Sequence, residues 1–398
     1  MIFLIESSRT PIYNRIAVAF SKALQGLGHV VHFYDPTGMD DSSFSDTINS
    51  IEIDCYFSTN VFNKLHDFNE ITQRFNFEDI RHKMIFIHHD SAFCPPNSVA
   101  NINHKLNALI YHQNKISHFF IETVNIKQFN DLGIKNCYPL NHASEFSAGQ
   151  ETTDFTHGIS FVGHLMSGLS LYPLIREDLG HHLIGLAWNR YSRSSFEIQP
   201  EIDRIGREDY LMRAMNIPIA HNLSKHRYLM QQVTKFTMAY RGEVISNIKN
   251  HTIDIYGGDL SYGKIDNPLL KIDRPHVSYH AATSDYSDTA NIYAKSKVSL
   301  NISSLQFDSA INNRIIDIVL AGGFVLTDRR DDLLKASALA HDISFDTPEE
   351  MQFKLDYFLN PKNLEHYLNV KSRVYEEFKV KYSYETVCQE ILQSVVSA

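Results

Sequence analysis

Short apolar runs alternate with segments of helical spacing along the first 150 residues. The apolar runs lie at 2–6, 30–35, 54–59, 83–89, 118–123 and 136–141. Segments with helical spacing or length lie between them, at 13–28, 62–75, 99–115 and 125–133. Near-continuous apolar strands that alternate with helices are typical of a parallel sheet covered on both faces. The pattern therefore predicts a doubly wound, Rossmann-like α/β domain over residues 1–150.

A second series of the same kind follows a polar stretch at 147–158. Its predicted strands lie at 159–164, 252–258, 297–303, 323–328 and 341–346, and amphipathic helices follow to residue 395. We leave the helix-rich region 170–250 unassigned. The series predicts a second Rossmann-like domain over 158–380. Two doubly wound domains facing each other leave a cleft between the carboxyl ends of their sheets, and ligands of such sheets bind there.

Charge and cysteine content exclude several classes of function. The chain of 398 residues has a formal net charge of -9 and no basic cluster, which argues against a nucleic-acid partner. Its four cysteines, Cys55, Cys94, Cys137 and Cys388, form no C-x-x-C pair, which argues against a zinc site and a disulfide framework. The 21 histidines lack the spacing of metal ligands.

The apolar runs also bear on location. The longest, near 315–326, is interrupted by Asp317 and two glycines and is too short for a transmembrane helix. The N-terminal MIFLIESSRT reads as a first strand rather than a signal peptide, so we expect the protein in the cytoplasm. Contact with a membrane surface stays open, although no basic amphipathic face supports it.

The stretch NNRIIDIVLAGGFVLTD, residues 312–328, combines an apolar helix face with polar groups. We expect Asp308 or Ser309 to cap this helix. Its first turn would then offer free amides, the positive end of the helix dipole, Asn313 and the guanidinium group of Arg314. That combination suits a phosphate or diphosphate.

Two further features of this helix suggest a ligand. Asp317 lies too deep to cap the helix, and its carboxylate can accept two hydroxyl hydrogen bonds, as a ribose diol would donate. Gly322 and Gly323 would permit a left-handed turn and let a ligand approach the backbone. The same residues also fit a surface pair between Arg314 and Asp317, with Gly322 as an ordinary helix end.

The segment 288–328, together with TPEEMQFKLDYFLNPKN after it, resembles the C-terminal domain of the spore-maturation CgeB-like glycosyltransferases. These belong to the GT-B fold and the glycosyl transferases group 1 superfamily. The resemblance implies that the residue at Asp317 binds the ribose of a nucleotide sugar. Ser309 stands where many retaining members carry a glutamate that contacts the sugar, so the resemblance does not settle the stereochemistry. The matching residues are Leu300, Asn301, Asn313, Arg314, Asp317, Gly322, Gly323, Thr327 and Asp328.

Two other strand ends resemble the same family. TIDIYGG resembles the strand whose loop lies near the base, which assigns Tyr256 and Gly257. ISFVGH resembles the first strand of the C-terminal domain, whose glycine lets the loop approach the diphosphate, which assigns Gly163 and His164. Taken alone, both fit plain strand ends. The resemblance also implies that the last helix, 381–398, returns to the N-terminal domain.

The N-terminal half offers its own candidates. His89 and Asp90, in MIFIHHDSAFCPP, follow a strand, and a histidine beside a carboxylate can shuttle a proton near neutral pH. Many GT-B enzymes have a histidine here that contacts the donor sugar, so we expect His89 and Asp90 to be catalytic. Alternatively, nearby backbone satisfies the imidazoles. Expected on the acceptor side are Ser7, Arg9, Glu122, Asn141 and His142.

The leading hypothesis is a glycosyltransferase that moves a sugar from a nucleotide-diphosphate sugar to a glycan, protein or small-molecule acceptor. We expect it to need no cofactor and no metal, because no convincing D-x-D motif is present. The alternatives are a nucleotide-sugar epimerase of the same fold, a non-catalytic nucleotide-sugar-binding protein, and a two-domain sugar-binding protein that closes on its ligand.

Overall fold

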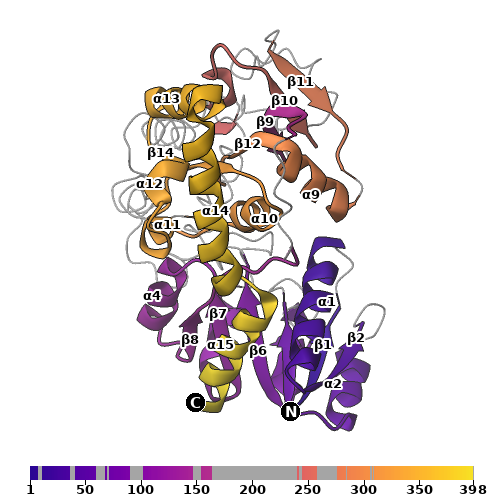
Figure 1. Ribbon diagram of the computed structural model, residues 1–398. Helices are drawn as coiled ribbons and strands as arrows, with labels where there is room; N and C mark the ends of the chain where they lie inside the picture. Colours follow the sequence, from indigo (N-terminus) through magenta and orange to yellow (C-terminus); the bar gives the residue numbers. More distant parts are fainter. Residues whose placement is uncertain are drawn as a thin grey trace, which may run out of the picture. The chain divides into compact units, whose positions relative to one another are not determined.

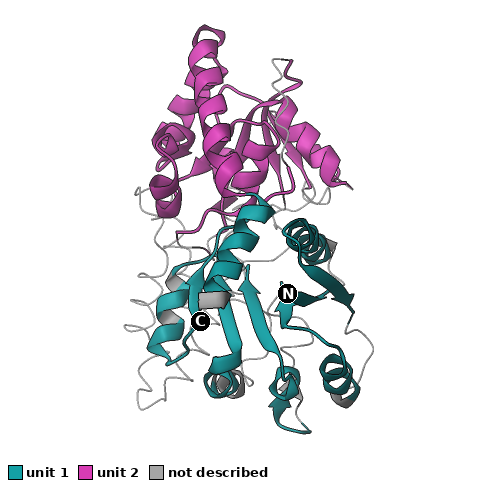
Figure 2. Cartoon of the chain, turned by 60° about the horizontal axis from the view of Figure 1, so that its bottom comes forward, with its two compact units in different colours: residues 1–143, 206–229, 383–398 teal, residues 144–205, 230–382 magenta. Residues whose placement is uncertain are grey.

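The protein consists of two compact units, shown in different colours in Figure 2. Residues 1–143, 206–229 and 383–398 belong to the first, and residues 144–205 and 230–382 to the second. The computed structural model describes residues 1–7, 11–35, 41–59, 68–69, 71–89, 102–146, 154–163, 240–241, 244–257, 276–283, 285–304, 307 and 309–397.

The first unit is built on a parallel sheet of six strands in the order β2-β1-β3-β6-β7-β8. The strands are β1 (Ile2–Glu6), β2 (Val30–Tyr34), β3 (Cys55–Ser58), β6 (Lys83–His88), β7 (Ile116–Phe120) and β8 (Cys137–Pro139). All six were predicted, because buried parallel strands carry continuous apolar runs. The core beside them is rich in aromatic side chains, which include Phe44, Tyr56, Phe77, Phe86 and Phe120.

Five helices accompany this sheet in the described part of the chain. They are α1 (Pro11–Gly26), α2 (Asp41–Ser50), α3 (Ile102–Tyr111), α4 (Val124–Asp131) and α15 (Tyr384–Ser397). Helices α1 and α15 lie side by side, with the rings of Phe20 and Tyr384 in edge contact at 5.0 Å (Figure 1). The helix predicted near 62–75 is wrong where the chain is described, since β4 (Phe68–Asn69) and β5 (Arg74–Phe75) form an antiparallel pair there.

The second unit has a parallel six-stranded sheet in the order β11-β10-β9-β12-β13-β14. The strands are β9 (His157–Val162), β10 (Ile253–Tyr256), β11 (Val277–His280), β12 (Ser296–Asn301), β13 (Val325–Asp328) and β14 (Ser344–Phe345). Edge strand β11 was missed, because its partly exposed sequence VSYH has no apolar run. The predicted strand 341–346 starts instead as α12 (Ala340–Ile343).

Helix α10 (Asn313–Leu320) contacts α9 (Tyr286–Lys295) and α14 (Leu364–Lys381) in the second unit (Figure 1). Helices α11 (Asp331–Ala336) and α13 (Pro348–Leu359) complete the set among the described residues. The apolar stripe of α10 is fully buried, as its spacing predicted. Because α10 follows β12 and precedes β13, its first turn lies at the carboxyl edge of the sheet.

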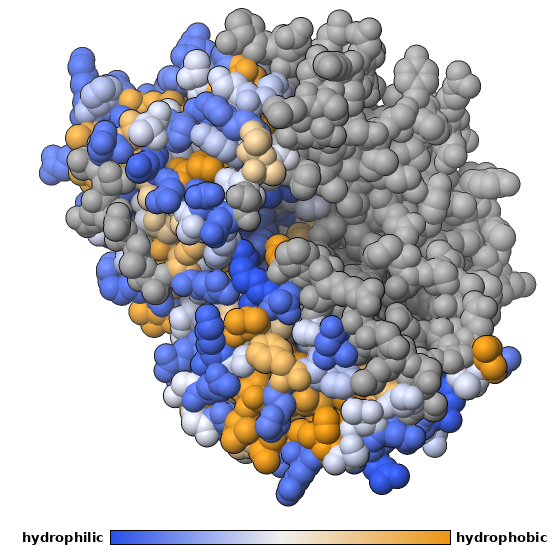
Figure 3. All heavy atoms as spheres, turned by 90° about the vertical axis from the view of Figure 1, so that its right-hand side faces the viewer, coloured by the Kyte–Doolittle hydropathy of each residue, from blue (hydrophilic) through white to orange (hydrophobic). Residues whose placement is uncertain are grey.

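The surface carries few large apolar groups. Met1, Val30 and Phe33 are partly exposed on and beside β2, the edge strand of the first sheet. Figure 3 shows apolar side chains in the lower part of the face on that side. No helix in the described parts of the chain is long and apolar enough to cross a membrane.

Candidate functional site

Helix α10 begins one turn later than predicted. Asn312 is the N-cap, and its side-chain oxygen accepts a hydrogen bond from the Ile315 amide at 3.1 Å. The proposed cap Ser309 is wrong, because its hydroxyl donates to a carboxylate oxygen of Asp332 at 2.7 Å instead. Asp308 lies outside the described residues. The helix still presents its first amides at the carboxyl edge of the sheet.

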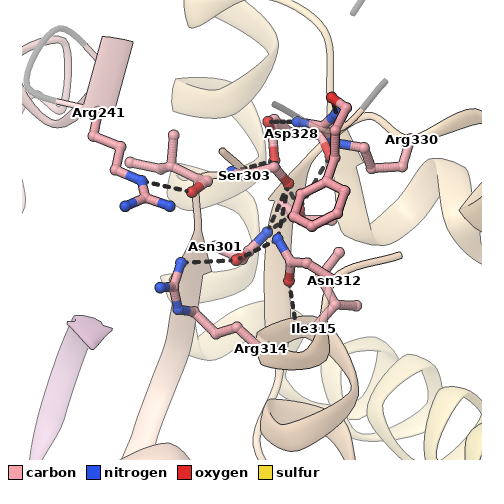
Figure 4. Close-up of polar contacts among 11 residues, drawn as sticks. Arg241, Asn301, Ser303, Asn312, Arg314, Ile315, Asp328 and Arg330 are labelled. Carbon is pink, nitrogen blue, oxygen red and sulfur yellow. Dashed lines mark hydrogen bonds and ion pairs between the residues drawn. The ribbon is translucent and has the colours of Figure 1, made fainter. Parts of the chain in front are cut away.

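Asn301, at the end of β12, organises this edge and is fully buried. Its side-chain amide nitrogen donates to the Thr327 hydroxyl at 2.8 Å. Its side-chain oxygen accepts from Nη1 of Arg314 at 3.2 Å, as Figure 4 shows. Asn301 was predicted to bind the donor, but its hydrogen bonds show that it holds the side chain of Arg314.

A buried ion pair supports the same edge from β13. Asp328 and Arg330 are both fully buried, and Nη2 of Arg330 lies 2.8 Å from Oδ2 of Asp328. The other carboxylate oxygen of Asp328 accepts from the amide and hydroxyl of Ser303, at 3.0 and 2.8 Å. Nη1 of Arg330 donates to the Phe307 carbonyl. This network fixes the chain after β12, because each group has a partner on another segment.

Arg241 joins the edge from a distant part of the sequence. It is buried, and its Nε donates to the Ile302 carbonyl at 3.0 Å. Burial first, and then the charge of Arg314, lowers the pKa of Arg241 to about 9. Figure 4 shows the guanidinium groups of Arg241 and Arg314 on the same side of the chain after β12. Two cations held this close favour binding of an anion between them.

Two glycine turns adjoin Arg314. The amide of Gly163 donates to the Tyr256 carbonyl, and Gly257 follows with φ +87°. Gly163 has φ +147°, and an added Cβ would come within 2.5 Å of Nη2 of Arg314. Glycine is therefore needed at 163 for Arg314 to lie where it does, with its guanidinium carbon 5.2 Å from the ring centre of Phe161. His164 lies outside the described residues.

Tyr256 is engaged with neighbouring strands. Its hydroxyl lies 3.2 Å from Nε2 of His157, and its ring stacks on His280 at 4.4 Å. Both histidines also contact the carboxylate of Asp254, at 3.0 and 2.7 Å. The Tyr256 side chain thus links β10 to its neighbouring strands β9 and β11. Its carbonyl accepts the hydrogen bond that holds the Gly163 turn.

Asp317 lies inside the second unit. Only 6% of it is exposed, and Oδ1 accepts a hydrogen bond from the Tyr286 hydroxyl at 2.5 Å. The ring of Tyr286 stacks on Phe146 at 4.2 Å. Because Asp317 is buried and Arg314 donates to Asn301, the alternative of a helix-surface pair is wrong. Asn313, the first helical residue, is half-buried.

Gly322 and Gly323 do not belong to this edge. They end α10, so they lie at the amino end of β13, the opposite edge of the sheet. Gly322 has φ +81°, and the amides of Gly322 and Gly323 donate to the Val319 and Ile318 carbonyls. This hydrogen-bond pattern is a Schellman motif. The predicted donor contact is therefore wrong for both glycines, which close the helix.

The first unit places His89 against His142. Both are buried, and their rings stack at 5.5 Å, with Tyr13 at 6.2 Å from His89. Neither ring nitrogen of His89 has a hydrogen-bond partner among the described residues, so satisfaction by nearby backbone is wrong for this residue. Burial lowers the pKa of His89 to about 4. Burial and then His89 lower the pKa of His142, so both rings are neutral at pH 7.

The other candidates of the first unit are scattered. The amide of Ser7 continues the sheet by donating to the Tyr34 carbonyl. Glu122 is buried at the start of α4, and Asn141 is exposed. Asp90 and Arg9 lie outside the described residues. The fold thus brings together His89 and His142 from the predicted set.

No group of three or more His, Cys, Asp or Glu side chains in the described part of the chain could hold a metal ion. The clearest charge at the candidate site is cationic and comes from Arg241 and Arg314. The need for a metal stays a question for experiment.

Sequence reasoning missed Arg241 and Tyr286. Arg241 contacts a residue 61 positions away and Tyr286 one 31 positions away, so neither stands in a local motif. The sequence could have identified Asn312 as the N-cap of α10, since asparagine is as good an N-cap as serine or aspartate.

One family model matches the C-terminal part of the chain. Residues 241–393 match the family model described as Glycosyl transferase-like, and Arg241 is the first residue of that match. No curated protein matches the chain.

Solved structures resemble the whole chain. The β-glucosyltransferase of phage T4 in complex with UDP-glucose has a TM-score of 0.56 at 9% identity, covering 99% of both chains. HepE of Anabaena, in complex with UDP and glucose, has a TM-score of 0.56 at 10% identity, covering 100% of both. An α-glucosyltransferase bound to UDP and a 13-mer DNA has a TM-score of 0.53 at 9% identity and full coverage. This likeness shows the fold and confirms the predicted GT-B class.

Proposed function

We infer that the protein is a glycosyltransferase that uses a nucleotide-diphosphate sugar, with the donor held by the second unit. The observation that carries this function is the pair of arginines, Arg241 and Arg314, beside the first turn of α10. Arg314 donates to Asn301, the last residue of β12, and Arg241 to Ile302, the next residue, so their positions are set before any ligand arrives. Preorganised cations of this kind suit a diphosphate.

The same pair would serve the chemical step. Transfer breaks the bond between the anomeric carbon and the diphosphate and forms one to an acceptor oxygen, whose proton must leave. Negative charge grows on the diphosphate as that bond breaks, and fixed cations stabilise it more in the transition state than in the ground state. We therefore expect the leaving group to be stabilised without a metal or cofactor.

Asp317 would bind the ribose of the donor. It lies on α10 one turn beyond Arg314, so one short helix would hold both the ribose and the phosphates of the nucleotide. In the first unit, neutral His89 would hydrogen-bond to a hydroxyl group of a substrate, because its two ring nitrogens could donate and accept. Its low pKa argues against a role as an imidazolium acid.

The similar solved structures contain UDP or UDP-glucose, so UDP-sugars are the first donors to test. For the acceptor we keep a glycan, protein or small molecule, since the net charge of -9 disfavours a nucleic acid. The likeness to the CgeB-like subgroup and a location in the cytoplasm stay predictions.

The test is a thermal-shift screen of the wild type and Asp317→Ala with UDP, GDP, ADP, CMP and their sugar conjugates. A ligand specific to the folded state raises the melting temperature. We expect one nucleoside diphosphate to raise the melting temperature of the wild type and to leave that of Asp317→Ala unchanged. If no nucleotide shifts the wild type, the donor-site function is wrong.

A second candidate is a protein that binds a nucleotide sugar without transferring it. Ser309 favours it, because its hydroxyl is bound to Asp332 where many retaining relatives carry a sugar-binding glutamate. Release of free nucleotide from the shifted conjugate, with and without an acceptor mixture, separates the two. Binding without any turnover would favour this candidate.

A further inference from the structure

Tyr286 donates a hydrogen bond to the carboxylate of Asp317. Its hydroxyl donates to Oδ1 at 2.5 Å, from the first residue of α9 to the second turn of α10. No sequence motif links the two helices. The contact therefore results from the fold, and it falls on the carboxylate that the proposed function assigns to ribose.

The phenol ring is held by stacking, and the start of its helix is held by a cap. Phe146 stacks on it with ring centres 4.2 Å apart and planes 15° from parallel. Asp285, the N-cap of α9, accepts a hydrogen bond from the Ser287 amide at 2.9 Å and fixes the start of the helix. A donor fixed in this way costs little further side-chain entropy when its partner binds a ligand.

The hydrogen bond restricts the carboxylate. Asp317 is only 6% exposed, so its charged form depends on hydrogen-bond donors around it. A carboxylate has about four acceptor sites, so it can accept from the Tyr286 hydroxyl and from hydroxyl groups of a ligand at the same time. The phenol also sets the plane of the carboxylate, on which two-hydroxyl recognition depends.

We propose that Tyr286 is a positioning residue that orients Asp317 toward the ribose hydroxyls and so sets a preference for ribonucleotides over 2′-deoxyribonucleotides. The proposal rests on the proposed function. The opposite arrangement is that the phenol occupies the place of a ribose hydroxyl and must leave. The fixed ring argues for positioning, and the two arrangements predict opposite changes in affinity.

The experiment measures the affinity of the full chain for the ribo- and 2′-deoxy forms of UDP, GDP, ADP and CDP by calorimetry. The variants are Tyr286→Phe, which keeps the ring and removes only the hydroxyl, and Tyr367→Phe as a matched control. Tyr367 is a buried tyrosine of the same unit that donates to the Lys297 carbonyl at the start of β12, the sheet edge opposite the site.

We expect the wild type to bind one ribonucleotide about tenfold more tightly than its deoxy form, as a hydrogen bond to a charged group would give. Tyr286→Phe should reduce that ratio to about twofold or less, and Tyr367→Phe should keep it. A purely structural role would lower both affinities equally and leave the ratio intact.

Three results would overturn the proposal. If Tyr286→Phe keeps the wild-type ratio, the positioning role is wrong while the donor function stands. Tighter ribonucleotide binding by Tyr286→Phe would show that the phenol blocks the site, and it too leaves the donor function intact. If the wild type binds none of the eight nucleotides, both this proposal and the proposed function fail.

Discussion

The guanidinium group of Arg314 occupies the space that a side chain at residue 163 would fill. An added Cβ at Gly163 would lie 2.5 Å from Nη2 of Arg314, while the same addition at Gly158 meets nothing within 4 Å. The missing side chain at the end of β9 thus leaves the space that Arg314 of α10 fills. A glycine motif and an arginine motif far apart in sequence form one structural unit.

Gly163→Ala should therefore act on the nucleotide through Arg314. We expect about a tenfold or greater loss of nucleoside diphosphate affinity, because the guanidinium group must move. Strain at φ +147° should add a loss of about 1–3 kcal/mol in the free energy of unfolding. Calorimetry and urea unfolding measure the two effects. Gly158→Ala is the control, and equal affinities for the two variants would contradict the prediction.

Arg241→Met and Arg314→Met should each weaken nucleoside diphosphate binding by about tenfold or more, since each removes a charged donor. The loss should be smaller for the matching monophosphate, which carries less charge. Titration of both nucleotides against each variant measures this difference. Arg373→Met, an exposed arginine on α14, is the control. Equal losses for the two nucleotides would mean that the pair does not contact the diphosphate.

The glycines that end α10 should affect stability and not binding. Gly322→Ala forces φ +81° on a residue with a Cβ and should cost about 1 kcal/mol. Gly323→Ala should cost more, because its Cβ would lie 2.8 Å from the Tyr293 carbonyl oxygen. Urea unfolding measures both costs. If folded Gly322→Ala binds the nucleotide more weakly than the wild type, these glycines contribute to the donor site and the prediction is wrong.

Asp328→Asn should be strongly destabilising. It leaves the fully buried Arg330 without its charged partner, which typically costs about 3–5 kcal/mol. Asp131→Asn breaks an exposed pair with Lys127 on α4 and should cost below about 0.5 kcal/mol. Chemical unfolding of both variants provides the comparison. Similar costs would show that the buried network contributes little.

His89 should make the first unit sensitive to acid. Its pKa is about 4 in the folded protein and about 6.5 when unfolded, so below pH 6.5 the unfolded state binds more protons. The free energy of unfolding is therefore unaffected by the protonation of His89 above about pH 6.5. It falls by about 3 kcal/mol as the pH drops toward 4. Urea unfolding of the wild type and His89→Phe at pH 7 and 4.5 tests this. We expect a smaller loss in the variant, and an equal loss would refute the assignment.

The sequence predicted the sheets better than the site. Parallel strands are buried on both faces, so their apolar runs are visible locally, whereas β11 carries polar residues on a partly exposed edge. Arg314 and Asp317 were singled out because they share one helix with a family pattern, and their binding roles stay predictions. Arg241 and Tyr286 depend on contacts between separate segments, which no local pattern shows. Gly322 and Gly323 were misassigned because a helix end and a ligand turn use the same residue type.

Helix α15 has a consequence for synthesis on the ribosome. It packs on α1 through Phe20 and Tyr384, and Val387, Cys388 and Ile391 are buried within the first unit. Domains usually fold as units in the order of their translation. Here the first unit lacks a helix until the whole second unit has been translated. The nascent chain must therefore keep the apolar face of α1 soluble during that interval, a natural task for a molecular chaperone.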